Sequence, residues 1–276
     1  MTLAFIGLAV GCSSAPKTEP VTGASGGSST SEPEVRSGGS GAASEVKDTR
    51  GVNQRYVALS QALRGGRAQQ VQEEAARILA SNPDDLVTLN ALAMWNYRQK
   101  KVGAAKLLLA RAIEKGEPRA AILNNYGLML LAEGDEDAAV EQFKKALRLD
   151  ERHAEASANL GSYYAKGGDW RKALPRLEVA WNAGRQDSSI ANNYAITLRG
   201  LGENEKSRRI FDEAVKRNNK DTTLLLNYAA LLIEGMNRPK EGLPLVYRVK
   251  FLETEKRDVI NRANQLERKA SSASTP

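Results

Sequence analysis

Hydrophobic and polar positions follow a regular pattern along most of this chain. Between about Val52 and Glu255, apolar residues recur every three or four positions within each segment, the spacing that places them on one face of a helix. Gly, Asp, Asn or Pro separates one segment from the next. Residues 120–153 show the unit clearly: a helical segment, a turn at Gly134 and Asp135, and a second helical segment. The pattern predicts an all-α fold built from helical hairpins.

The hairpin recurs every 34 residues. In each predicted second helix, a small residue is followed four positions later by Leu or Phe, and three positions after that by Ala. The three slots are Ala105, Ala139, Ala173 and Ser207; Leu109, Phe143, Leu177 and Phe211; and Ala112, Ala146, Ala180 and Ala214. Two helices approach closely only where side chains are small, and the larger residues fill the remaining space. The small residues are therefore predicted to be packing contacts.

With these residues in these slots, the chain resembles the tetratricopeptide repeat (TPR). The resemblance implies a right-handed superhelix of about six helix-turn-helix repeats with a capping helix and tail at 256–276. The expected repeats are 52–85, 86–119, 120–153, 154–187, 188–221 and 222–255. In the last repeat, one inserted residue is needed to place Gly242 in the small-residue slot. Pro175 and Pro244 are expected in the first turn of their helices, where no amide hydrogen bond is lost.

The N-terminal part of the chain differs in composition from the repeats. Residues 13–51 consist mainly of Ser, Gly, Thr, Pro and Ala, so we expect a disordered linker there. Residues 3–10 form an apolar run that ends just before Gly11 and Cys12. This segment resembles a bacterial lipoprotein signal, which implies that residues 1–12 are a signal peptide with Cys12 as its lipidation site. The resemblance implies a lipid anchor in the bacterial outer membrane, facing the periplasm. The alternative is a buried apolar segment with a free thiol.

The inventory of reactive side chains argues against an enzyme. His153 is the only histidine, and we interpret it as a solvated turn residue. The acidic run from Glu133 to Asp137 lacks the ligand spacing of a calcium loop and is interpreted as a solvated turn. The net charge of +7 is uneven, with +5 in residues 86–119 and −3 in 120–153, which does not favour nucleic acid. We therefore predict no cofactor, no metal, no nucleic acid and no small-molecule substrate.

A solenoid of repeats offers instead a concave face, formed by one stripe of each first helix. We predict that partner proteins of the cell envelope bind there, through amide groups that hydrogen-bond a peptide and apolar side chains that contact it. The predicted stripe consists of Asn90, Met94, Tyr97, Arg98, Asn124, Leu128, Leu131, Ser162, Lys166, Asn192, Ile196 and Arg199. A second interpretation stays open: Asn90, Asn124 and Asn192 could hydrogen-bond between neighbouring repeats.

A lipid-anchored chain of six such repeats is similar to the pilotins of type IV pilus assembly, which bring an outer-membrane secretin to its site. Leu123 to Gly127, with the sequence LNNYG, is like a stretch in the third repeat of that family. The alternative is a TPR lipoprotein of another envelope complex, such as a gliding-motility machine, barrel assembly or the regulation of peptidoglycan synthesis. Either way, the expected role is a protein-interaction scaffold anchored through Cys12.

Overall fold

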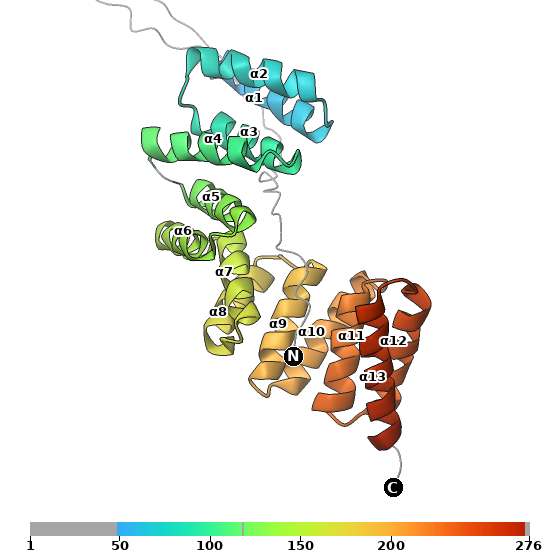
Figure 1. Cartoon of the computed structure of the whole chain (residues 1–276). Coiled ribbons are helices and arrows are strands. Elements are labelled where there is room, and N and C mark those ends of the chain that lie inside the picture. The colour runs from blue at the N-terminus through green and yellow to red at the C-terminus, as the bar shows by residue number, and fades with distance from the viewer. Residues whose placement is uncertain (1–48, 118, 274–276) are drawn as a thin grey trace, which may run out of the picture. The chain divides into compact units, whose positions relative to one another are not determined.

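The computed structural model describes residues 49–117 and 119–273, and all regular elements within them are helices (Figure 1). The α-helices are α1 (Thr49–Arg64), α2 (Ala68–Ser81), α3 (Leu86–Arg98), α4 (Val102–Lys115), α5 (Ala120–Glu133), α6 (Glu136–Leu149), α7 (Ala154–Lys166), α8 (Trp170–Asn182), α9 (Ser188–Gly200), α10 (Asn204–Arg217), α11 (Thr222–Ala230), α12 (Pro239–Leu252) and α13 (Arg257–Ala273). A π-helix, η1 (Leu231–Gly235), directly follows α11.

The expected signal peptide, 1–12, lies outside the described residues, as does the expected linker up to residue 48. Residues 49–51, which were assigned to that linker, are the first residues of α1. The chain divides into two compact units within α2, between Ile78 and Leu79. In the N-terminal unit, α1 buries Leu59 and Ala62, and α2 buries Val71, Ala75 and Ile78.

In the unit that begins at Leu79, consecutive helices pack against one another from α3 to α13. In addition, each first helix of a pair contacts the first helix of the next pair, so that α3, α5, α7, α9 and α11 form one continuous row. The helix α13 contacts both α11 and α12, as the first helix of a further pair would. It therefore covers the apolar end of the stack, burying Ala263, Leu266 and Ala270.

Neighbouring helices approach each other most closely at the slots that hold small residues. A Cβ atom at Gly127 of α5 would lie 2.7 Å from Cε1 of Phe143 in α6, and one at Gly161 would lie 2.8 Å from Cγ of Leu177. Ala146 and Ala180 are completely buried. A larger residue in these slots would have to displace a neighbouring helix, because interiors at this packing density hold few voids.

The inserted residue of the last repeat is found in η1. A π-helix accommodates one additional residue within a helix, and the N–H of Met236 accordingly bonds the carbonyl of Leu231, five residues earlier, at 2.9 Å. Beyond this insertion Gly242 lies in the small-residue position, where an added Cβ would lie 2.5 Å from Cγ1 of Ile233. The irregularity expected in the last repeat is thus local.

The helices α3, α7, α9 and α11 each begin after a capping residue at the same position of the repeat. The carboxylates of Asp85, Asp187 and Asp221 each accept a hydrogen bond from the backbone N–H three residues later. His153 occupies the same position before α7, where its Nδ1 accepts from the N–H of Ala156 at 3.2 Å. Its side chain is only 14% exposed, so the interpretation as a solvated turn residue was wrong: His153 is a partly buried cap.

The two prolines lie deeper in their helices than expected. Pro175 is in the second turn of α8 and Pro244 in the second turn of α12, so each removes one hydrogen bond from its helix. Both residues are on the exposed side of the helix, where water can solvate the carbonyl that loses its partner.

Candidate interaction surface

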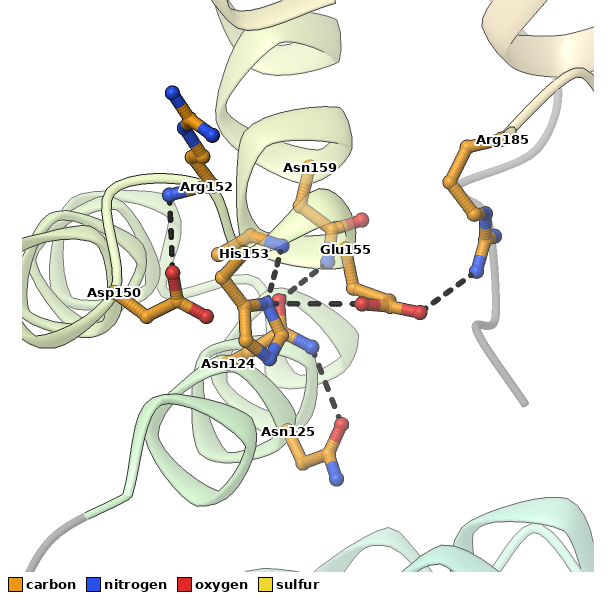
Figure 2. A network of polar contacts seen from close by, with 9 residues as sticks. Asn124, Asn125, Asp150, Arg152, His153, Glu155, Asn159 and Arg185 are labelled. Carbon is orange, nitrogen blue, oxygen red and sulfur yellow. Dashed lines mark hydrogen bonds and ion pairs between the residues drawn. The ribbon is translucent and has the colours of Figure 1, made fainter. Parts of the chain in front are cut away.

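Asparagines link the first helices of successive repeats. Asn125 of α5 donates from Nδ2 to Oδ1 of Asn90 in α3 at 2.8 Å, and Asn159 of α7 donates to Asn124 of α5 at 2.9 Å. Asn124 also donates to Oδ1 of Asn125 at 3.2 Å, and Figure 2 shows this bond together with the one from Asn159. With Asn90, these amides form a chain across α3, α5 and α7. We call this row of amide contacts the asparagine ladder.

The ladder continues to α11 with one substitution. Asn227 of α11 donates to Asn192 of α9 at 2.8 Å. Between α9 and α7 the acceptor position holds Ala158, and Asn193 instead donates to Oγ of Ser162, one turn further along α7, at 2.9 Å. Each repeat from the second to the fifth is thereby connected to the next by one amide hydrogen bond. These bonds support the interpretation that the predicted Asn residues bond between repeats.

Two cations of the predicted stripe, Lys166 and Arg199, also connect neighbouring repeats. Lys166 Nζ donates to Glu136 Oε1 at 2.7 Å, and Arg199 Nη2 donates to Glu234 Oε2 at 3.0 Å. Lys269 of α13 donates to the other oxygen of Glu234 at 2.5 Å. Burial would raise the pKa of Glu234, but these two hydrogen bonds outweigh it and lower the pKa below the usual 4.5. This contribution to stability is therefore present above pH 4.5 and is lost as the pH falls through the lowered value.

The remaining members of the predicted stripe differ in exposure. Leu128 and Ile196 are buried in the core, as are Asn124, Ser162 and Asn192 of the ladder. Met94, Tyr97 and Leu131 are partly exposed, with one side against the core formed by α3 to α7. Arg98 is exposed beside them at the end of α3. We call Met94, Tyr97, Arg98 and Leu131 the α3–α5 patch; it is the part of the predicted stripe that combines apolar character with exposure.

Two features were missing from the predicted stripe. The first is the set of ladder donors, Asn125, Asn159, Asn193 and Asn227, whose 34-residue spacing is visible in the sequence. The second is a cleft of about 350 Å³ between α4, α5 and α6. It is lined by Ile113, Leu123, Tyr126, Gln142, Lys145, Arg148 and Leu149. No single residue in this set carries a motif.

Among residues 49–117 and 119–273, no His, Cys, Asp and Glu side chains gather in a group of three or more that could hold a metal ion. None of the helices within 49–117 and 119–273 has both the length and the apolar composition needed to cross a membrane.

Comparisons with known proteins agree with this geometry. A family model described as tetratricopeptide repeat matches residues 130–195. An uncharacterized lipoprotein of Treponema pallidum is 25% identical over 99 residues, which are 36% of this chain and 50% of the relative. A TPR repeat-containing protein of Dictyostelium discoideum is 25% identical over 132 residues, covering 44% of this chain and 49% of the relative. The chain thus spans about half the length of these curated relatives.

Solved structures resemble the chain over a larger part of its length. YrrB, described as a TPR protein with an unusual peptide-binding site, has a TM-score of 0.57 at 15% identity and covers 69% of this chain and 97% of its own. A TPR protein of Parabacteroides merdae has a TM-score of 0.55 at 16% identity, covering 82% and 94%. MamA of Desulfovibrio magneticus has a TM-score of 0.53 at 20% identity, covering 62% and 97%. Together with the repeated slots and paired helices, these matches confirm that the chain has the all-α tetratricopeptide-repeat fold.

Proposed function

We propose that this chain is a protein-interaction scaffold that binds a segment of a partner protein at the α3–α5 patch. The observation that carries the proposal is the combination of a hydrogen-bonded ladder with apolar side chains left partly exposed beside it. Tyr97 and Leu131 occupy the same slot in consecutive first helices, and α3 contacts α5. The ladder fixes the register of these helices, so the two side chains are presented with a set spacing.

Such a pair suits an extended or helical peptide with two apolar side chains. Tyr and Met offer large contact areas, and Tyr97 also carries a hydroxyl that can hydrogen-bond a peptide main chain. YrrB, which has the same fold, is described as containing a peptide-binding site, and this supports a peptide as the class of ligand.

Replacing Tyr97 and Leu131 with Ala together is expected to reduce partner capture about tenfold or more, because a few anchors carry most of the energy of an interface. The measurement is a quantitative pull-down from solubilised envelopes of the organism that carries the chain. Both side chains are partly exposed, so helicity should be retained and is checked by circular dichroism. Val57→Ala, at an exposed site on α1, is the control. Unchanged recovery of the same partners by the double variant would exclude the patch as the binding surface.

We further propose that Cys12 is lipidated and holds the scaffold on the bacterial outer membrane, facing the periplasm. The apolar run before Cys12 supports this proposal, and the similarity to a Treponema lipoprotein over part of the chain is consistent with it. Several acyl chains on one residue give a stable anchor, at about 0.8 kcal/mol for each buried methylene. The 39 residues of the expected linker, as a flexible chain, would span about 35 Å.

Cys12→Ser is expected to abolish incorporation of labelled palmitate and to move the protein from the membrane to the soluble fraction, or to block its processing. The measurement is metabolic labelling followed by fractionation. Retention of the unlabelled variant in the membrane fraction would contradict the lipid anchor while leaving the interaction surface untouched.

Within this proposal the specific partner follows from the sequence resemblance. A pilotin-like scaffold would recover an outer-membrane secretin in the pull-down. A scaffold of gliding motility, barrel assembly or peptidoglycan synthesis would recover proteins of those complexes instead. The identity of the captured partner distinguishes these roles.

A further inference from the structure

The cleft between α4, α5 and α6 is separate from the α3–α5 patch and has its own chemistry. The side of the cleft next to the core is lined by Ile113 of α4 and by Leu123 and Tyr126 of α5. Its outer edge is lined by Leu149, an exposed residue at the end of α6. Leu149 is 54% exposed, one of the few large apolar side chains in the described residues with that much contact to water. The cleft is therefore an apolar depression that is open to solvent.

The polar residues of the cleft give it a positive charge. Lys145, Arg148 and Gln142 line it, so the lining contains two cations and no acid. Another lysine of α6, Lys144, has its charge balanced by Glu141 at 2.7 Å. Among the described residues, neither Lys145 nor Arg148 forms an ion pair or a side-chain hydrogen bond. An occupant that brings carboxylates next to an apolar group would match both features.

The same place two repeats later shows that the fold can fill this depression. There, Trp181 stands in the slot of Ile113, Tyr194 in that of Tyr126, and Ala191 in that of Leu123. Trp181 is only 8% exposed and packs on Tyr194, with ring centroids 5.9 Å apart. Arg217, in the slot of Leu149, lies over the indole at 5.7 Å. The later site is closed by Trp181, whereas the cleft between α4, α5 and α6 has the smaller Ile113 at that position and the exposed Leu149 at its edge.

We propose that the α4–α6 cleft is a second binding site, for a partner segment that places one large apolar side chain beside acidic residues. The apolar side chain takes the space that Trp181 fills in the later repeat. The carboxylates lie near Lys145 and Arg148, and the amide of Gln142 can hydrogen-bond the main chain of the segment. The site would recognise an acidic, partly apolar peptide and would act independently of the α3–α5 patch.

A displayed library of short random peptides, panned on the folded full chain, tests this proposal. Enriched peptides are expected to contain one Leu, Ile, Phe or Trp with Asp or Glu close by. Two variants then test where they bind. Ile113→Trp with Leu123→Ala copies the closed site of the later repeat and fills the cleft, while Lys145→Glu with Arg148→Glu reverses its charge without touching a buried residue.

Each variant is expected to weaken the binding of these peptides about tenfold or more, because loss of a central anchor has an effect of this size in other interfaces. Higher salt should weaken binding to the wild type, since exposed charges are screened. The control, Lys216→Glu with Lys220→Glu, makes the same change in net charge away from the cleft. The peptides should bind the Tyr97→Ala, Leu131→Ala variant as well as the wild type. No enrichment of acidic apolar peptides, or equal binding to the charge-reversed and wild-type chains, would overturn the proposal.

Discussion

Replacing Ala146 with Trp will destabilise the protein by about 1–3 kcal/mol or more. Ala146 is completely buried in the core formed by α3 to α7, and protein interiors are packed too densely to take an added indole ring. The added atoms must therefore push α6 away from its neighbours or force other side chains out of their preferred rotamers. The stability of a repeat array is nearly the sum of the stabilities of its repeats and of the interfaces between them. The loss should therefore be greatest in the third repeat and in the repeats next to it.

Chemical denaturation followed by circular dichroism measures the total loss, and amide hydrogen exchange locates it. Glu141→Trp adds the same side chain on the exposed face of α6 and is expected to change stability by no more than about 0.5 kcal/mol. An Ala146→Trp chain as stable as the Glu141→Trp chain would show that the repeat register is wrong.

Removing the amide of Asn124 is expected to cost about 1–3 kcal/mol, the cost of leaving a buried polar group without a partner. Asn124 accepts from Asn159 and donates to Asn125. Asn159 is almost completely buried, and its Oδ1 has no hydrogen-bond partner. In the Asn124→Ala variant both polar atoms of the Asn159 side chain would therefore lack partners.

A double-mutant cycle with Asn159→Ala tests whether this energy resides in the ladder. If the two amides depend on each other, the double variant will lose less stability than the sum of the losses in the two single variants. The expected coupling free energy is about 0.5–3 kcal/mol. Asn182→Ala, at an exposed position near the end of α8, is the matched control. Additive effects of the two ladder substitutions would mean that their hydrogen bond contributes nothing to stability.

The helical hairpins could be predicted because the repeat determines which slots must hold small residues. The slots of Ala146 and Ala180 allow few alternatives, and the spacing of 34 residues identifies them without a structure. The inserted residue in the last repeat was detectable for the same reason. Its position in η1 could not be predicted, because an extra residue in a π-helix and an extra residue in the turn both shift the following slots by one position.

The candidate site was harder to predict because exposure depends on packing between repeats. Asn124 and Tyr97 both belong to first-helix slots of the predicted stripe, yet one is buried in the ladder and the other is partly exposed. The role of His153 could have been predicted from its slot, which holds Asp85, Asp187 and Asp221 in other repeats. The cleft exists because Ile113 is smaller than Trp181, which stands in the same slot two repeats later. The effect of this size difference can be seen only when the positions of the helices are known.

Site-specific photo-crosslinking tests most directly whether this scaffold holds its partner at the α3–α5 patch. A benzophenone amino acid replaces Tyr97 in the full chain, which is produced and irradiated in the organism that carries it. The same probe at Tyr247, an exposed aromatic residue on α12, is the control. We predict a discrete crosslinked species from position 97 that is lost when Leu131→Ala is added, and none from position 247. A partner crosslinked from position 247 and not from position 97 would contradict the central claim.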